Sequence, residues 1–270
     1  MHKFRYGLLL LSLTLLSGTA LSDTERADLE AGKPTVMITG ANRGIGLEFV
    51  RQYSALDWNI IATARNPKKA KELKALADED PNIIIVELDV TDHTRIDWLA
   101  ETYKDQPIDI LLSNAGITPK YASAFRRVKG IDFDMASKSF EVNAAGPLKL
   151  SQAFMKHVAA SQQKKIIIIS SKAGSFEVSP KMPMMYSYRA SKAALNMFMY
   201  TLAFETPKQG VTLALLSPGQ VNTMGPDGPK VPNAIEPPES VSKMIAIMDG
   251  LTPEDNGRFI SYVDGSDIGW

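Results

Sequence analysis

Tyr188 and Lys192 have the residue types and the spacing of a pair that can move a proton. Residues four apart on a helix share a face, so the Tyr188 hydroxyl and the Lys192 ammonium can point into one site. An isolated phenol has a pKa of about 10 and transfers protons poorly at neutral pH. A positive charge about 4 Å away, at an effective dielectric of about 20, favours the phenolate by roughly 4 kcal/mol. We therefore expect Lys192 to lower the pKa of Tyr188 and make it a general acid or base. The alternative is a surface lysine beside a partly buried tyrosine.

A candidate for binding a carbonyl oxygen follows the apolar run Ile166–Ile169. Ser170 and Ser171 come directly after this run, where a buried strand would end. We favour Ser171, because Gly174 follows it by three residues, and we keep Ser170 as the alternative.

A glycine-rich turn spans Thr39–Gly46, between a short apolar run and an amphipathic stretch. Gly40, Gly44 and Gly46 let the backbone turn sharply and approach a pyrophosphate, and the following helix would face the phosphates with its first N–H groups. The spacing is Gly-x-x-x-Gly-x-Gly and not Gly-x-Gly-x-x-Gly. A plain turn between a strand and a helix is therefore the alternative to a dinucleotide site.

Short apolar runs that alternate with helical patterns must position these residues. Several runs are continuously apolar, as expected of parallel strands buried on both faces. Helical spacing recurs in Pro67–Ala77 and from Tyr188 to about Glu205. The pattern predicts an α/β fold with a doubly wound, seven-stranded parallel sheet, whose ligands bind beyond the carboxyl ends of the strands. The predicted strands are Val36–Thr39, Ile60–Thr63, Ile83–Val86, Ile108–Leu112, Ile166–Ile169, Val211–Leu216 and Phe259–Tyr262.

Two segments interrupt this alternation, and both follow predicted strands. Thr118–Met135 is either a border of the binding crevice or an ordinary surface loop. For Pro218–Pro238, which is rich in proline and glycine, we favour a loop that covers the substrate.

The composition is that of an ordinary globular protein of 270 residues, with 44% hydrophobic and 22% charged residues. Basic and acidic residues number 30 each, so nothing indicates nucleic acid as a partner. The absence of cysteine excludes disulfides, thiolate catalysis and cysteine metal sites. The three histidines are scattered without metal-ligand spacing, and we predict no metal.

The N-terminus has the pattern of a secretory signal peptide. A basic start at His2, Lys3 and Arg5 precedes an apolar stretch centred on Leu8–Leu16, and Ala20-Leu21-Ser22 offers a cleavage site. A short membrane anchor is the alternative, because an uncharged stretch of this length lies at the lower limit for a bilayer span.

We therefore divide the chain into a leader, residues 1–22, and one catalytic domain, residues 33–270. The leader predicts export or membrane association. A cytoplasmic location is the alternative.

Along nearly all of residues 35–270 the chain resembles the short-chain dehydrogenase/reductase family. The resemblance implies a single-domain Rossmann fold. The sequence around Tyr188 and the ending from Gly257 to Trp270 are similar to the branch of C-factor and sniffer-like carbonyl reductases. The motifs that carry the resemblance are Thr39–Gly46, Asp89-Val90, Asn114-Ala115-Gly116, Asn143, Ser171, Tyr188 with Lys192, and Pro218-Gly219 leading to Val221 and Thr223.

The resemblance implies a catalytic set of Asn143, Ser171, Tyr188 and Lys192. Asn143 would hold a water in a proton relay to Lys192, and Lys192 would also hydrogen-bond the nicotinamide ribose. A homodimer or homotetramer is implied as well.

The same resemblance implies the cofactor contacts. Asp89 would contact the adenine, although a loop cap is the alternative, and Asn114 would line the adenosine side or simply brace a strand end. Val221 and Thr223 would hold the carboxamide. Ser113 departs from the family, which often has a second asparagine there, and we expect no effect on the chemistry. The implied cofactor-binding residues are Gly40, Asn42, Arg43, Gly44, Ile45, Gly46, Arg65, Asp89, Val90, Asn114, Ala115, Gly116, Tyr188, Lys192, Pro218, Gly219, Val221 and Thr223.

The end of the second predicted strand favours NADP over NAD. A carboxylate there would bind the ribose 2′-hydroxyl of NAD, but the sequence reads Ala64-Arg65-Asn66. Arg65, with Arg43, can pair with a 2′-phosphate through charge-assisted hydrogen bonds. The alternative is that Arg65 only faces solvent.

These observations predict an NADP-dependent oxidoreductase that interconverts a carbonyl and an alcohol. The alternative is a nucleotide-binding regulatory or signalling protein with little turnover, since a fold does not fix a function. An apolar substrate wall is predicted, and an apolar aldehyde or ketone is favoured, although clustered methionines more often serve ordinary packing. The residues of this wall are Phe176, Met182, Met184, Met185 and Tyr186.

Overall fold

The computed structural model describes residues 29–118, 125, 127–223 and 233–270. The predicted leader, residues 1–22, lies outside the described residues. So do parts of the two segments that interrupt the alternation of strands and helices.

All seven predicted strands form, each within two residues of its predicted bounds, and they make one parallel sheet. Their order across the sheet is β3-β2-β1-β4-β5-β6-β7, which confirms the doubly wound α/β architecture. The strands are β1 (Thr35–Ile38), β2 (Asn59–Ala64), β3 (Ile83–Glu87), β4 (Ile110–Ser113), β5 (Lys165–Ile169), β6 (Thr212–Ser217) and β7 (Phe259–Ser261).

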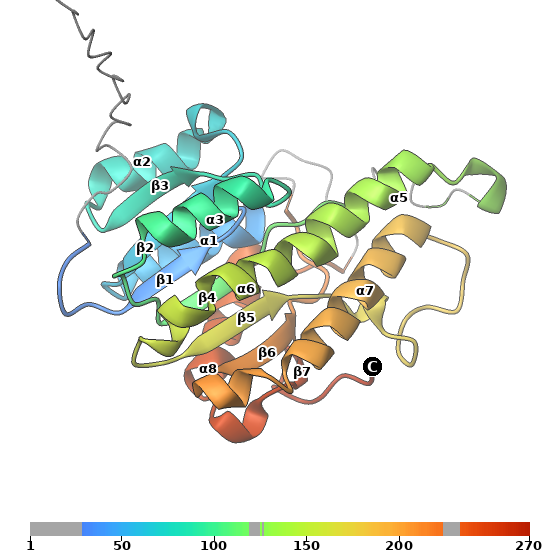
Figure 1. Cartoon of the computed structure of the whole chain (residues 1–270). Helices are drawn as coiled ribbons and strands as arrows, with labels where there is room; N and C mark the ends of the chain where they lie inside the picture. The colour runs from blue at the N-terminus through green and yellow to red at the C-terminus, as the bar shows by residue number, and fades with distance from the viewer. Residues whose placement is uncertain (1–28, 119–124, 126, 224–232) are drawn as a thin grey trace, which may run out of the picture.

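Helices cover both faces of the sheet (Figure 1). The helices α3, α6 and α7 bury their apolar side chains against one face, and α1, α2 and α8 against the other. Because both faces are covered, the strands are apolar almost throughout and their side chains are buried. The α-helices are α1 (Gly44–Ala55), α2 (Lys71–Glu79), α3 (His93–Thr102), α5 (Phe133–Phe140), α6 (Gly146–Ala159), α7 (Tyr186–Leu202) and α8 (Pro237–Asp249).

The winding of the sheet reverses at β1. Ile38, the last residue of this strand, pairs with Ala62 of β2 on one side and with Leu112 of β4 on the other. The chain leaves β1 and β4 towards opposite faces, so a crevice opens beyond their carboxyl ends. The glycine-rich turn follows β1 and Asn114 follows β4, which brings both to this crevice.

Two helices differ from their predicted bounds. The predicted helix over Pro67–Ala77 is divided into a 3₁₀ turn, Pro67–Lys69, and α2, because Ala70 leaves the helical conformation with ψ of 65°. Helix α7 ends at Leu202, short of Glu205. The amide of Glu205 turns back to the carbonyl of Leu202, and a 3₁₀ turn with Pro207 in its first turn follows.

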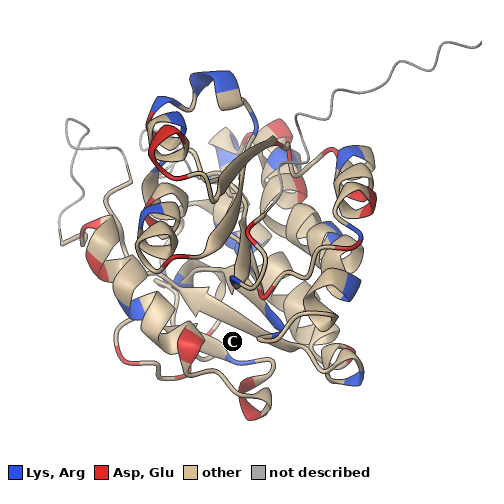
Figure 2. Ribbon diagram, turned by 90° about the vertical axis from the view of Figure 1, so that its left-hand side faces the viewer, with Lys and Arg blue, Asp and Glu red and all other residues tan. Residues whose placement is uncertain are grey.

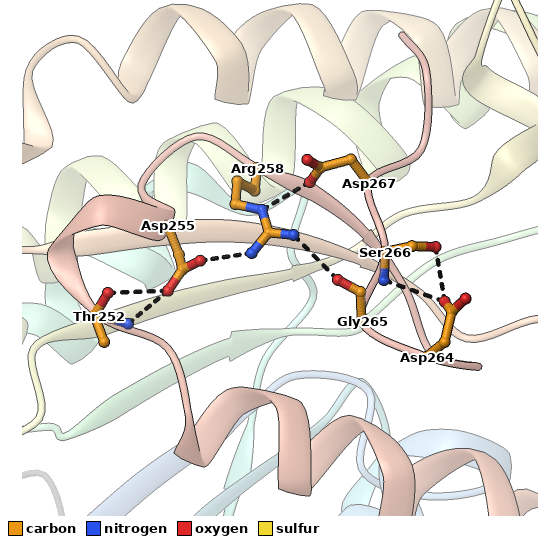
Figure 3. A network of polar contacts seen from close by, with 7 residues as sticks. All are labelled: Thr252, Asp255, Arg258, Asp264, Gly265, Ser266 and Asp267. Carbon is orange, nitrogen blue, oxygen red and sulfur yellow. Dashed lines mark hydrogen bonds and ion pairs between the residues drawn. The ribbon is translucent and has the colours of Figure 1, made fainter.

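A polar network around Arg258, just before β7, ties the start of this strand to the segment that follows it (Figure 3). The Arg258 guanidinium donates to the carboxylates of Asp255 (2.6 Å) and Asp267 (2.7 Å) and to the carbonyl of Gly265 (3.1 Å). Asp255 in turn accepts from the amide and hydroxyl of Thr252. The planar guanidinium thus joins the segment before β7 to the segment after it.

Charges of both signs are interspersed over the helices in the view of Figure 2, in line with the balanced composition. In the part of the chain that the structure describes, no helix has the length and apolar character needed to cross a membrane.

Candidate active site

Tyr188 and Lys192 lie in the first turns of α7, on the side that faces the end of β5. The Lys192 Nζ lies 6.0 Å from the centre of the Tyr188 ring. It donates a 2.8 Å hydrogen bond to the carbonyl oxygen of Ile169, the last residue of β5. Lys192 is buried, whereas Tyr188 is half-buried. The pair therefore lies where the carboxyl end of β5 meets the start of α7.

The electrostatics of this pair differ from the expectation. Burial raises the pKa of Tyr188, and its hydrogen bond with the Ser171 side chain only partly opposes this. Burial also lowers the pKa of Lys192 to about 8. The expected lowering of the Tyr188 pKa by Lys192 is not seen, because the ammonium is directed at the Ile169 carbonyl and not at the phenol. Tyr188 is thus held in its protonated form at neutral pH.

The two adjacent serines face different surroundings. The Ser171 side chain interacts with the Tyr188 phenol and lowers its pKa. Ser171 Oγ accepts from the amide of Ala173 at 3.2 Å, which starts the 3₁₀ turn Lys172–Gly174. Ser170 is buried, and its hydroxyl donates to Asn196 Oδ1 at 2.6 Å. Neighbouring residues of an extended chain point in opposite directions, so only one serine can face Tyr188. That serine is Ser171.

Gly174 allows the 3₁₀ turn to pack directly on α7. A Cβ at this position would lie 2.6 Å from the carbonyl carbon of Lys192. The backbone around Ser171 and the backbone around Lys192 are therefore in contact, which fixes the two side chains relative to each other.

Asn143 lies in a π-helical turn, Glu141–Ala145, that joins α5 to α6. Its Oδ1 accepts from the amide of Ile117 at 2.7 Å, and its Nδ2 donates to the Ile117 carbonyl and to Ser191 Oγ, both at 2.9 Å. The Ser191 hydroxyl donates to the Tyr188 carbonyl at 2.8 Å. The side-chain amide of Asn143 thus uses its hydrogen bonds on groups of the protein itself. Pro147 has no N–H, so the α-helical hydrogen bond to the Asn143 carbonyl does not form.

The glycine-rich turn is a cradle with no room for side chains. A Cβ on Gly40 would lie 2.9 Å from Ala115 Cα, and a Cβ on Gly46 would overlap the Gly40 carbonyl oxygen. Gly40 and Gly44 also have φ of 67° and 58°, which favour glycine. The first turn of α1 carries no acidic residue, and the Arg43 side chain does not cap it. Its N–H groups fit an anion such as a pyrophosphate.

Asn114 braces this turn. Its Nδ2 donates to the carbonyls of Thr39 (2.9 Å) and Gly40 (3.3 Å), and Thr39 Oγ1 accepts from the amides of Asn114 and Ala115. The structure therefore supports the bracing interpretation of Asn114, and a contact with adenosine stays a prediction.

Arg65 lies at the end of β2 with its side chain 67% exposed and its guanidinium 4.0 Å from the Asp89 carboxylate. Asp89 also accepts from the amide and hydroxyl of Thr91, so it is a loop cap, as its alternative interpretation held. Arg43 reaches across to the Thr223 carbonyl at 3.2 Å. An exposed guanidinium beside the crevice, with no carboxylate at the end of β2, fits a 2′-phosphate.

The remaining predicted cofactor residues line the same edge. Gly219 has φ of 80°, and a Cβ there would overlap the Tyr262 ring. Val221 forms a bridge with Ile235, across the segment 224–232, which is outside the described residues. The other residues at this edge are Asn42 and Ile45 in the glycine-rich turn, Val90 against Gly146, Ala115 against Gly40, Gly116 against Asn143, and Pro218, whose carbonyl accepts from Ser240.

The predicted apolar wall is at the surface. Phe176 is 90% exposed, Met182 49% and Tyr186 40%, whereas Met184 and Met185 are half-buried. Ordinary packing does not account for the three exposed side chains. No cluster of three or more potential metal ligands occurs among residues 29–118, 125, 127–223 and 233–270.

The sequence interpretation missed two residues. Ser191 links Asn143 to the backbone of Tyr188, and Arg189 binds the loop before α7. The serine lies between Tyr188 and Lys192 in the sequence, which was the available signal for it.

Comparison with known proteins agrees with this geometry. Residues 34–226 match the family model described as short chain dehydrogenase. An uncharacterised oxidoreductase of Schizosaccharomyces pombe is 34% identical over 256 residues, which cover 88% of this chain and 98% of the relative.

Two solved structures have the same fold. NADPH-bound carbonyl reductase from chicken fatty liver is 33% identical, with a TM-score of 0.79 over 88% of this chain and 99% of that one. Carbonyl reductase Sniffer of Drosophila melanogaster is 30% identical, with a TM-score of 0.77 over 88% of this chain and 100% of that one. The resemblance inferred from the motifs is confirmed.

Proposed function

This chain is an oxidoreductase of the short-chain dehydrogenase/reductase family, and from that premise we propose that it interconverts a carbonyl compound and an alcohol with NADP(H). The observation that carries the proposal is the arrangement of three side chains: Ser171 interacts with the Tyr188 phenol and lowers its pKa, and Lys192 is buried one helical turn further along α7, bonded to the Ile169 carbonyl. Two hydroxyl groups that converge in this way can both bind one carbonyl oxygen.

The residues present fit NADP. The glycine cradle and the first turn of α1 would hold the pyrophosphate, and Arg65 with Arg43 would pair with the 2′-phosphate. The NADPH-bound carbonyl reductase among the similar structures supports the same choice. When bound, the cofactor supplies the hydride for the carbonyl carbon, which the protein itself cannot provide.

The chain's own residues handle the proton. Ser171 orients the substrate oxygen by donating a hydrogen bond. Tyr188, whose pKa is raised by burial, remains protonated at neutral pH and donates its proton to the same oxygen as the alcohol forms. In the reverse direction Tyr188 accepts the proton from the alcohol.

Lys192 and Asn143 would return a proton to Tyr188 after each turnover. The lowered pKa of Lys192, about 8, lets this group exchange protons near neutral pH. The Asn143 carbonyl would hold the water of the relay, and the hydrogen bond from Asn143 Nδ2 to Ser191 fixes this carbonyl relative to α7.

The exposed side chains Phe176, Met182 and Tyr186 support an apolar aldehyde or ketone as substrate. The test is NADPH consumption by the purified protein across a panel of such carbonyls, with Tyr188→Phe alongside. We expect Tyr188→Phe to lose about 10²–10⁴-fold in kcat while still binding NADPH. If Tyr188→Phe retains wild-type turnover, the assignment is wrong. NADPH binding without any turnover would favour the regulatory alternative.

We also propose that the chain forms a homodimer or homotetramer. Met197 and Tyr200 of α7 and Phe204, two residues after its end, are exposed, which supports a covered surface there. Sedimentation of the purified protein tests it, and a monomer at all concentrations would contradict it.

For the location, export or membrane association remains our proposal, supported by the pattern of the first 22 residues. N-terminal sequencing of the mature protein with cell fractionation tests it. An intact Met1 in a soluble cytoplasmic fraction would overturn it.

A further inference from the structure

The connection from β5 to α7 begins and ends at the candidate active site. Ser171 lies at its start and Tyr188 just after its end, and the Ser171 side chain interacts with the Tyr188 phenol at the base of the loop. Figure 1 shows this connection, in yellow, next to the start of α7. A substrate that contacts both hydroxyls would therefore lie at the base of this loop, whose residues 175–185 we call the substrate loop.

The first half of the substrate loop is held by the last residues of the chain. The Ser175 hydroxyl donates to the Gly269 carbonyl at 2.6 Å, and the amides of Phe176 and Glu177 donate to the Trp270 carbonyl at 3.1 and 3.2 Å. The Trp270 ring in turn packs on Tyr200 of α7. Arg258 fixes this tail to β7 through Asp267 (Figure 3).

The second half is held by Arg189, the residue directly after Tyr188. Its Nη1 donates to the Met182 carbonyl at 2.9 Å and its Nη2 donates to Ser179 Oγ at 2.7 Å. Ser179 is buried. Among the ion pairs of the described residues, none involves Arg189. The guanidinium therefore donates its hydrogen bonds to the loop and not to a carboxylate.

The loop needs such a restraint, because its last residue is strained. Met185 has φ of 51° and ψ of 40°, a left-handed conformation that residues with a side chain rarely adopt. Such a conformation persists only where the surroundings hold it. The backbone amide at position 189 also donates to the Met185 carbonyl at 2.9 Å, a helical bond that does not depend on the arginine side chain.

We propose that Arg189 is a positioning residue that fixes the second half of the substrate loop, which carries Met182, and so sets the preference for long over short apolar carbonyl substrates. The inference rests on the proposed function. Met182 lies in the half that Arg189 holds and Phe176 in the half that the last residues of the chain hold, and both side chains are exposed. A fixed apolar wall can bind a long chain without first ordering itself, whereas a short substrate does not reach it.

The test compares Arg189→Met and Arg189→Lys with the control Arg51→Met. Arg51 lies on α1 and is ion-paired with Glu72, away from the loop. The readouts are kcat and KM for straight-chain aldehydes of increasing length with NADPH. We expect Arg189→Met to lose about tenfold in kcat/KM for the longest aldehyde, mainly through KM, and less than about twofold for the shortest. Arg189→Lys should lie between, because an ammonium lacks the planar fork.

Hydrogen exchange of the backbone amides in residues 175–185 provides a readout independent of activity. We expect faster exchange there in Arg189→Met, with exchange elsewhere and NADPH affinity unchanged. Unchanged exchange, or faster exchange with an unaltered length preference, would overturn the inference. If Arg189→Met does not fold, Arg189→Lys decides in the same way. If the wild type reduces no aldehyde, the proposed function fails and the length preference with it, while exchange still shows whether Arg189 holds the loop.

Discussion

The Lys192 Nζ donates a 2.8 Å hydrogen bond to the carbonyl oxygen of Ile169, two residues before Ser171. This bond joins α7 to the end of β5 at the level of the two candidate catalytic hydroxyls. It also places an ammonium in a buried position without a carboxylate, and burial accordingly lowers its pKa to about 8.

The first prediction is that the burial of Lys192 makes the free energy of unfolding depend on pH in the alkaline range. Between pH 8 and 10.5 the unfolded chain keeps the proton that the folded chain has lost, so the free energy of unfolding rises with pH in this window. The rise is at most about 3 kcal/mol, from 1.36 kcal/mol for each unit of pKa difference.

Urea unfolding of wild type and Lys192→Met on both sides of pH 8 measures this contribution. As the pH rises, the free energy of unfolding of the wild type should increase relative to that of Lys192→Met. A difference between the two proteins that stays constant with pH would show that Lys192 is not desolvated.

The second prediction separates the two serines. Ser171→Ala should lose about 100-fold in kcat, because it removes a hydrogen-bond donor to the substrate oxygen. It should also move the pH dependence of alcohol oxidation to higher pH, since the Ser171 hydrogen bond lowers the pKa of Tyr188. Ser170→Ala should retain activity but lose about 1–3 kcal/mol of stability, because buried Asn196 loses its partner. The reverse pattern in kinetics and urea unfolding would assign the role to Ser170.

Much of the fold was predictable because buried parallel strands are continuously apolar, as in Ile166–Ile169. The four-residue spacing likewise predicted the shared face of Tyr188 and Lys192. It did not predict the direction of the ammonium, which depends on a backbone carbonyl of another element.

Other parts of the site depend on the path of the chain. The partners of Arg189 lie in a loop whose shape no periodic pattern encodes. The side-chain amide of Asn143 binds Ile117 from within a π-helical turn, which no periodic pattern of the sequence predicts.

The third prediction concerns the choice of cofactor. Arg65→Ala should weaken NADPH binding about tenfold to a hundredfold and leave NADH binding nearly unchanged, because only the former carries the phosphate that a guanidinium would pair with. Titration of nucleotide fluorescence measures both affinities, with Arg51→Ala as the control. An equal loss for both nucleotides would mean that Arg65 supports the fold of the site and does not read the phosphate.

The fourth prediction tests the contact between the two catalytic segments. Gly174→Ala should lower the free energy of unfolding by about 1–3 kcal/mol, because its Cβ would meet the Lys192 backbone at 2.6 Å and backbone yields less easily than a side chain. It should also lower kcat, since α7 must move away from Ser171 to make room. Gly250→Ala is the matched control, because a Cβ there would meet its nearest atom, the Ile247 carbonyl oxygen, at 3.7 Å, an ordinary contact. Urea unfolding and NADPH-dependent turnover measure the two effects. If Gly174→Ala is as stable and active as Gly250→Ala, the close approach does not hold Ser171 and Lys192 in place.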